Sequence, residues 1–301
     1  MTTVIEVQDL VKTFGRTRAL DGLDLSVDEG EVHGFLGPNG SGKSTTIRVL
    51  LGMLRRRSGH ATVFGRDPWR DAVTIHRDVA YVPGDVSLWP NLSGGETIDF
   101  LTRLRGGADA GLRASLLKDF DLDPKKKGRS YSKGNRQKVA LVAAFARPAR
   151  LYIFDEPTSG LDPVMESVFR AHVERVQQGG ATVLLSSHIL SEVEQLCDRV
   201  TIVRAGKAVE TGTLREMRHL TRTSFRVATG ARLADVQKLA GVHDARAEAD
   251  ALVFDADTTA VNDVLAALTK AGVSSLTVSP PSLEDLFLRH YGDTIDAEPA
   301  A

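Results

Sequence analysis

A glycine-rich stretch, GPNGSGKST at residues 37–45, has the clearest chemical meaning in the sequence. It fits the pattern G-x-x-x-x-G-K-[S/T], whose backbone N–H groups wrap a polyphosphate. In this pattern the lysine, here Lys43, places a cation on the outer phosphates, and the hydroxyl of Ser44 can ligate Mg²⁺. The predicted nucleotide-phosphate site consists of Gly37, Pro38, Asn39, Gly40, Ser41, Gly42, Lys43, Ser44 and Thr45.

Two adjacent carboxylates, Asp155 and Glu156, follow the apolar run LYIF at residues 151–154. Open α/β sheets place ligands at the carboxyl ends of their strands, so this pair should meet the bound phosphates. We expect Asp155 to hold Mg²⁺ opposite Ser44, and Glu156 to act as the general base that polarises the attacking water. The alternative is a solvated pair of carboxylates at a strand end.

A histidine, His188, follows another apolar run, ATVLL at residues 181–185. An imidazole in this place can touch a γ-phosphate oxygen and so report its presence. The alternative is that the stretch SSH at residues 186–188 only caps a helix. Lys43, Glu156 and His188 are the candidate catalytic residues.

Composition limits the class of protein. A length of 301 residues suffices for one large domain and a small one, and a net charge of -1 gives no basic field for nucleic acid. The single cysteine, Cys197, excludes a disulfide framework and fits a reducing compartment; its helical surroundings favour a buried thiol. No run of 18 apolar residues occurs, so a partner would have to supply any membrane-spanning part.

The hydrophobic pattern predicts two domains. Strands and turns dominate up to about residue 80, helices from about 86 to 147, and strands and helices then alternate to residue 217. Short apolar strands between helices favour a mainly parallel α/β sheet. Residues 223–292 are expected to alternate strand and helix three times as a small α+β domain, and residues 293–301 to form a disordered tail.

These motifs, in this order, resemble the ATP-binding subunit of ABC (ATP-binding cassette) transporters over residues 4 to about 215. The stretch at 37–45 resembles Walker A, residues 151–156 Walker B, the SGLD that ends in Asp162 the D-loop, and residues 186–188 the switch-histidine loop. The resemblance implies a P-loop NTPase cassette, with a mixed sheet core and a helical subdomain, followed by the small α+β domain.

Phe14, in VKTFG, matches the aromatic residue that stacks on adenine in this family. Without the resemblance, its position in an alternating strand would favour a place in the core.

The resemblance also implies a function. ATP and Mg²⁺ would be bound between two copies of the subunit, as a homodimer, and hydrolysis would drive a separate membrane permease at the cytoplasmic face of the plasma membrane. The stretch PPSLEDLFLRHYG near the C-terminus resembles the accessory domain of drug- and antibiotic-export ATPases. The alternative is a non-transport ABC ATPase acting on ribosomes or DNA, whose usual second cassette, zinc inserts or coiled coils this sequence lacks.

Two stretches compete for the family's LSGGQ signature, LSGGE at residues 92–96 and YSKGN at residues 131–135. The signature must begin a helix whose N–H groups face the γ-phosphate of the partner's ATP, shortly before Walker B. The second stretch meets this requirement, so the resemblance assigns the trans clamp to Ser132, Lys133, Gly134 and Asn135. The first reads as a capping box, S-x-x-E, in which Ser93 and Glu96 start a helix.

One position departs from the family. Where the Q-loop carries a glutamine that reaches Mg²⁺ and the lytic water, this sequence has Gly84, in YVPGD. Our hypothesis is that the neighbouring Asp85 takes over part of that role, because a carboxylate oxygen is a suitable ligand for Mg²⁺.

Overall fold

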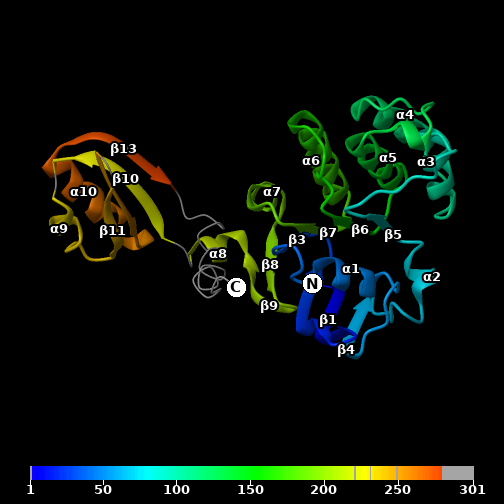
Figure 1. Cartoon of the computed structure of the whole chain (residues 1–301), viewed down its shortest axis with the longest axis horizontal. Helices are drawn as coiled ribbons and strands as arrows, with labels where there is room; N and C mark the ends of the chain where they lie inside the picture. Colours follow the sequence, from blue (N-terminus) through cyan, green and yellow to red (C-terminus); the bar gives the residue numbers. More distant parts are fainter. Residues whose placement is uncertain (1, 220–221, 231, 249, 280–301) are drawn as a thin grey trace. The chain divides into compact units, whose positions relative to one another are not determined.

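The computed structural model describes residues 2–219, 222–230, 232–248 and 250–279. The chain divides into two compact units, residues 1–211 and 212–301 (Figure 1). In the described part, no helix combines the length and the apolar character needed to cross a bilayer.

A six-stranded sheet forms the centre of the first unit, in the order β5-β6-β7-β3-β8-β9. The strands β5, β6, β7, β3 and β8 pair in parallel with their neighbours. Three of them, β3, β6 and β7, are buried along their whole length, as the apolar runs in β6 and β7 predict. The bounds are β3 Val32–Leu36, β5 Val79–Val82, β6 Leu151–Asp155, β7 Thr182–Ser187, β8 Arg199–Arg204 and β9 Lys207–Thr213.

A second, antiparallel sheet of order β2-β1-β4 makes the core of this unit mixed, as expected. Its strands are β1 Thr3–Phe14, β2 Thr17–Asp28 and β4 Ser58–Val63. Both β1 and β2 are longer than the apolar alternation suggests, because a register shift between Val7 and Leu10, with Asp9 at φ 46°, resets which face is buried. This sheet and α1 (Lys43–Leu50) lie on one side of the central sheet (Figure 1).

The other side carries α3 to α7, whereas α2 lies on the side of α1 and β4 (Figure 1). The helical subdomain consists of α3 (Gly94–Arg103), α4 (Ala110–Asp119), the short 3₁₀ helix η1 (Gly128–Ser130) and α5 (Lys133–Phe145). The central helix is α5, which contacts both α3 and α4 and is buried from Val139 to Phe145. The unit also contains α2 (Ala72–Ile75), α6 (Pro163–Gln178) and α7 (Leu190–Leu196).

The second unit contains a four-stranded antiparallel sheet of order β11-β12-β10-β13, with Phe225 and Phe254 stacked 5.0 Å apart in its core. Its elements are α8 Leu214–His219, β10 Thr223–Thr229, α9 Leu233–Val236, β11 Val242–Glu248, β12 Ala251–Ala256, η2 Thr258–Ala260, α10 Val261–Ala271 and β13 Val273–Ser279.

The expected order of strand and helix was wrong at β11, which the sequence pattern does not reveal. Within the described part of this unit the strand lies at the sheet edge and pairs with β12 alone, so its polar side chains need no apolar alternation. The helix expected around residues 282–292 and the tail at 293–301 lie outside the described residues.

Candidate functional site

The phosphate loop joins β3 to α1, as the motif predicts. A Cβ atom on Gly37 would lie 2.5 Å from the carbonyl oxygen of Val203, and one on Gly42 would lie 2.8 Å from Cδ2 of Leu20. Gly42 also precedes α1 with φ at 114°, a conformation that side chains rarely adopt. Glycine is therefore required at both positions, and the loop's backbone closes tightly around a small concavity.

Lys43 is buried inside this loop, with its side chain only 4 % exposed. Its Nζ donates to the carbonyl oxygen of Gly37 at 2.6 Å and of Pro38 at 3.2 Å. Burial lowers the pKa of Lys43, while the carboxylates of Glu156 and Asp155 act in the opposite direction. The loop thus holds an ammonium group in a fixed place.

The residues present fit a phosphate chain. The loop and its neighbours enclose a cavity of about 120 Å³, lined by Ala19, Asn39, Gly40, Gly42, Lys43, Ser44, Thr45 and Glu156. The buried hydroxyl of Ser41 has no hydrogen-bond partner among the described residues, so a donor is left for an anion.

Glu156 brings the three candidate catalytic residues together. Its Oε1 lies 3.7 Å from Nζ of Lys43 and 3.3 Å from Nδ1 of His188. Its backbone is left-handed, with φ at 50°, and its N–H donates to the carbonyl oxygen of Ser186 at 3.0 Å. A non-glycine residue in this conformation is strained, and such strain gathers at functional sites.

Asp155, the last residue of β6, is nearly inaccessible, at 6 % exposure. Its Oδ1 accepts a hydrogen bond from the hydroxyl of Ser186 in β7 at 2.5 Å. Sequence reasoning did not assign Ser186 a role of its own, although a polar pair at the end of the apolar run VLLSS was a usable signal. The carboxylate is therefore held in one orientation by the neighbouring strand.

The ring of Phe14 is 47 % exposed at the end of β1, so a place in the core is excluded. Nζ of Lys12 lies 5.0 Å from its ring centroid. Lys12 therefore lies over one face of a half-exposed ring, and stacking on adenine stays a prediction.

The LSGGE stretch is a capping box, as expected. Ser93 Oγ accepts from the backbone N–H of Glu96 at 3.2 Å, and Glu96 Oε2 accepts from the N–H of Ser93 at 2.6 Å. This backbone hydrogen bond, helped by the Ser93 side chain and Lys127, lowers the pKa of Glu96 to about 2.

The first N–H groups of this helix are already occupied, because those of Gly94 and Gly95 donate to the carbonyl oxygens of Lys126 and Pro124. Since both glycines are buried, this helix start cannot bind a phosphate of another molecule.

The YSKGN stretch begins α5 and faces solvent. Ser132 caps the helix by accepting from the N–H of Asn135 at 3.3 Å, and both Ser132 and Lys133 are exposed. Among the described residues, the N–H groups of Lys133 and Gly134 have no hydrogen-bond acceptor. The expected helix start is therefore confirmed, and its donors are free for an anion.

The predicted D-loop residue, Asp162, has a local structural task. Its Oδ1 accepts from the N–H groups of Val164 and Met165, both at 3.0 Å, and so caps α6. Ser159, the first residue of this SGLD stretch, contacts α5, because Nζ of Lys133 donates to Oγ of Ser159 at 2.7 Å.

Gly84 packs against the last residue of β6, Asp155, and against Glu156 after it. A Cβ atom there would lie 3.0 Å from the carbonyl oxygen of Asp155 and 3.6 Å from Cβ of Glu156. A glutamine would need a shift of the loop after β5, so the structure explains why glycine suits this position. Asp85 is exposed beside it, and its ligand role stays a prediction.

Cys197 is buried and free, as expected. Burial raises the pKa of its thiol, which therefore stays protonated and packs as a small apolar group.

The phosphate loop, the carboxylate pair after β6 and the exposed helix start at α5 together define a P-loop ATPase of the cassette type. The profile described as ABC transporter matches residues 20–159, and the profile described as the C-terminal domain of DrrA1-3-like ATP-binding proteins matches residues 212–291. The chain belongs to the family of ABC transporter ATP-binding proteins.

Two curated relatives match over nearly their whole length. Daunorubicin resistance ATP-binding protein DrrA3 of Streptomyces coeruleorubidus is 34% identical over 99% of both chains. Daunorubicin/doxorubicin resistance ATP-binding protein DrrA of Streptomyces peucetius is 34% identical over 98% of this chain and 94% of its own. A solved ATP-binding subunit of an ABC transporter, 32% identical, superimposes with a TM-score of 0.67 over 72% of this chain and 92% of that one.

Proposed function

We propose that this chain hydrolyses Mg-ATP to power the export of an antibiotic or another hydrophobic compound through a separate membrane permease. The observation that carries this proposal is the contact of the Glu156 carboxylate with both Lys43 and His188 at the phosphate loop. The names of two relatives that match over nearly their whole length describe daunorubicin resistance, which favours export. No relative reported above favours the alternative of a ribosome- or DNA-acting ATPase.

The site residues divide the chemistry among them. Lys43 neutralises the outer phosphates, Glu156 accepts a proton from the attacking water, and His188 contacts the γ-phosphate. The Ser44 hydroxyl and the Asp155 carboxylate would hold Mg²⁺, which supplies charge stabilisation on the phosphate oxygens. Phe14 would take the adenine ring, and the remaining loop residues the α- and β-phosphates.

We infer that two copies form a head-to-tail homodimer. Each chain carries both a phosphate loop and an exposed α5 start with free N–H groups at Lys133 and Gly134, so two identical chains can complete two sites. In that arrangement Ser132 and its neighbours clamp the γ-phosphate of the partner's ATP.

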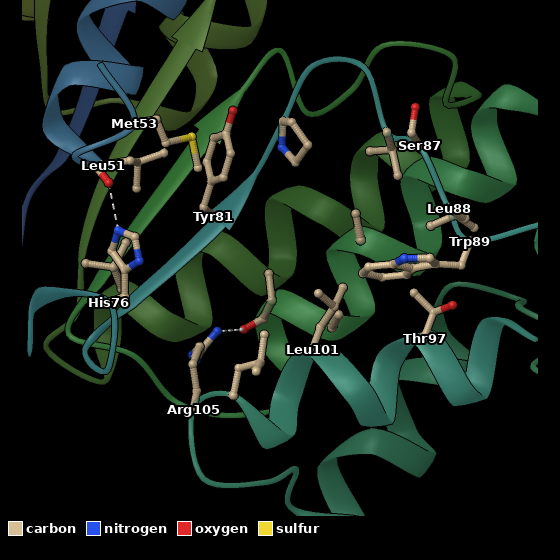
Figure 2. Close-up of a pocket in the computed structure, with 17 residues that line it drawn as sticks. Leu51, Met53, His76, Tyr81, Ser87, Leu88, Trp89, Thr97, Leu101 and Arg105 are labelled. Atoms are coloured by element: carbon tan, nitrogen blue, oxygen red, sulfur yellow. Dashed lines mark hydrogen bonds between the residues drawn. The ribbon is translucent and has the colours of Figure 1, made fainter. Parts of the chain in front are cut away.

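An apolar cleft between the central sheet and the helical subdomain is the proposed docking place for the permease (Figure 2). It encloses about 360 Å³, and Met53, Trp89 and Leu104 at its walls are 54%, 47% and 68% exposed. Exposed large apolar side chains around a hollow are typical of a protein interface. We propose that an apolar cytoplasmic segment of the permease occupies it and holds the subunit at the cytoplasmic face of the plasma membrane.

The cleft is connected to the catalytic residues through the loop after β5. Pro83 and Val86 line the cleft, and Gly84 between them packs on Asp155 and Glu156. Movement of a segment docked in the cleft would therefore reach the catalytic carboxylates directly, without a glutamine side chain.

Transport into membrane vesicles tests the export function, and replacement of an exposed cleft residue tests the docking place. Inside-out vesicles that contain the chain and its permease should accumulate daunorubicin or related compounds when ATP is supplied. Leu104→Asp should lower this transport at least about tenfold, because a buried interface charge costs several kcal/mol, and leave the basal ATPase unchanged. Val73→Asp, 76% exposed and outside the cleft, is the matched control. Absence of ATP-driven accumulation across a compound panel would contradict export, and full transport by Leu104→Asp would contradict the docking place.

Asp85 gives a separate test of the metal shell. If its carboxylate replaces the missing glutamine, Asp85→Ala should raise the Mg²⁺ concentration needed for half-maximal ATPase activity by about three- to tenfold. Asp85→Asn keeps one side-chain oxygen, so its half-maximal Mg²⁺ concentration should lie between those of the wild type and Asp85→Ala. An unchanged Mg²⁺ titration, with and without the permease, contradicts the hypothesis.

A further inference from the structure

Glu192, on α7, is a buried carboxyl group to which the motifs assign no task. The residue is only 8 % exposed. Its Oε2 accepts a hydrogen bond from Oγ of Ser187 at 2.6 Å. The same Ser187 Oγ accepts from the backbone N–H of Ile189 at 2.9 Å. The three residues thus form one hydrogen-bonded chain that spans the backbone of His188.

The direction of these hydrogen bonds depends on Glu192. A hydroxyl carries one proton and two lone pairs, so Ser187 can accept from Ile189 in good geometry only while its proton points elsewhere. The Ser187 hydroxyl donates this proton in its hydrogen bond to Glu192 at 2.6 Å, whereas the other available acceptor, the carbonyl oxygen of Ile189, lies at 3.4 Å. Without Glu192 the hydroxyl would keep only the longer contact with this carbonyl group, so the Ser187 side chain, and with it the turn at His188, would be held less firmly.

Glu192 also borders the segment that follows the catalytic carboxylate. Burial raises the pKa of the Glu192 carboxyl, although the hydrogen bond from Ser187 and the nearby buried hydroxyl of Thr158 act in the opposite direction. Oε1 of Glu192 makes no hydrogen bond among the described residues. A proton bound at Oε1 leaves Oε2 free to accept, so the contact with Ser187 persists in both protonation states.

We propose that Glu192 is a positioning residue for hydrolysis, which orients Ser187 and thereby holds His188 against Glu156. This inference rests on the proposed function, in which His188 and Glu156 act on the γ-phosphate and the water. The distance that it preserves is the 3.3 Å between Nδ1 of His188 and Oε1 of Glu156.

The test is a set of ATPase measurements on the purified full chain. Glu192→Ala should lower kcat at least about tenfold, with KM for ATP within about twofold, because a misplaced catalytic group affects turnover rather than ground-state binding. Glu192→Gln keeps an oxygen acceptor and should restore at least about half of the wild-type kcat. Gln195→Ala, an exposed position on the same helix, should match the wild type.

A double-mutant cycle separates positioning from general stability. If Glu192 acts through His188, Glu192→Ala should lower kcat no further in a His188→Ala background. Ser187→Ala removes the same hydrogen bond with little change of volume, and it should reproduce the loss of kcat if Glu192→Ala fails to fold. A wild-type kcat in Ser187→Ala or Glu192→Ala, or equal further losses in both backgrounds, overturns the proposal. A wild-type kcat in His188→Ala instead overturns the catalytic role of His188 in the proposed function.

Discussion

Replacement of Glu156 by glutamine is expected to lower ATP turnover at least about 100-fold, while ATP still binds. The amide has the shape of the carboxylate but cannot accept the proton of the attacking water. Lys43 and His188 both lose the negative oxygen that lies within 3.7 Å and 3.3 Å of them. ATP binding should persist because the loop that wraps the phosphates, Gly37 to Thr45, is unchanged.

The Glu156→Gln variant should therefore accumulate as an ATP-bound dimer. Steady-state ATPase assays measure the loss, a fluorescent nucleotide titration measures binding, and gel filtration with and without Mg-ATP measures dimerisation. Glu174→Gln, an exposed carboxylate on α6, is the matched control and should behave as the wild type. Turnover close to the wild-type rate in Glu156→Gln would remove Glu156 from the role of general base.

The arrangement of the candidate site could be predicted from the sequence, because each of its functional groups lies at or just after the end of a strand. The phosphate loop comes after β3, Asp155 ends β6, and His188 follows β7. Parallel strands that end at the same edge of a sheet bring such groups together, whatever the length and packing of the helices between them. The sequence thus predicted which residues meet, while the left-handed backbone of Glu156, which aims its side chain, required the structure.

The exposure of individual residues could not be predicted, because it depends on tertiary contacts. Phe14 belongs to an alternating strand, yet it is about half exposed at the end of that strand. The two serines of the competing signatures have the same local chemistry, since each caps a helix. Only the contacts of Gly94 and Gly95 with the carbonyl groups of a distant loop show that the first helix start is closed.

That pair of serines allows a matched test of the signature. Ser93→Ala and Ser132→Ala each remove an N-cap, so each should lower the free energy of unfolding by about 0.5–2 kcal/mol. Only Ser132→Ala should also lower kcat, by about 10- to 100-fold, because its hydroxyl faces solvent at the helix start proposed to clamp the partner's γ-phosphate. Urea unfolding and ATPase assays on the same samples separate the two effects.

Gly134→Asp should have the larger effect, a loss of kcat of at least about 100-fold. A carboxylate at this position would oppose the γ-phosphate of the partner's ATP across the dimer interface, although a negative charge at a helix N-terminus stabilises the helix itself. A Cβ atom on Gly134 would also lie 2.3 Å from the carbonyl oxygen of Gly160, so the adjacent D-loop must shift. The smaller change, Ser132→Ala, avoids this contact, and the equal loss of stability expected in Ser93→Ala serves as the control for its effect on folding. Loss of turnover in Ser93→Ala but not in Ser132→Ala would reverse the assignment of the signature.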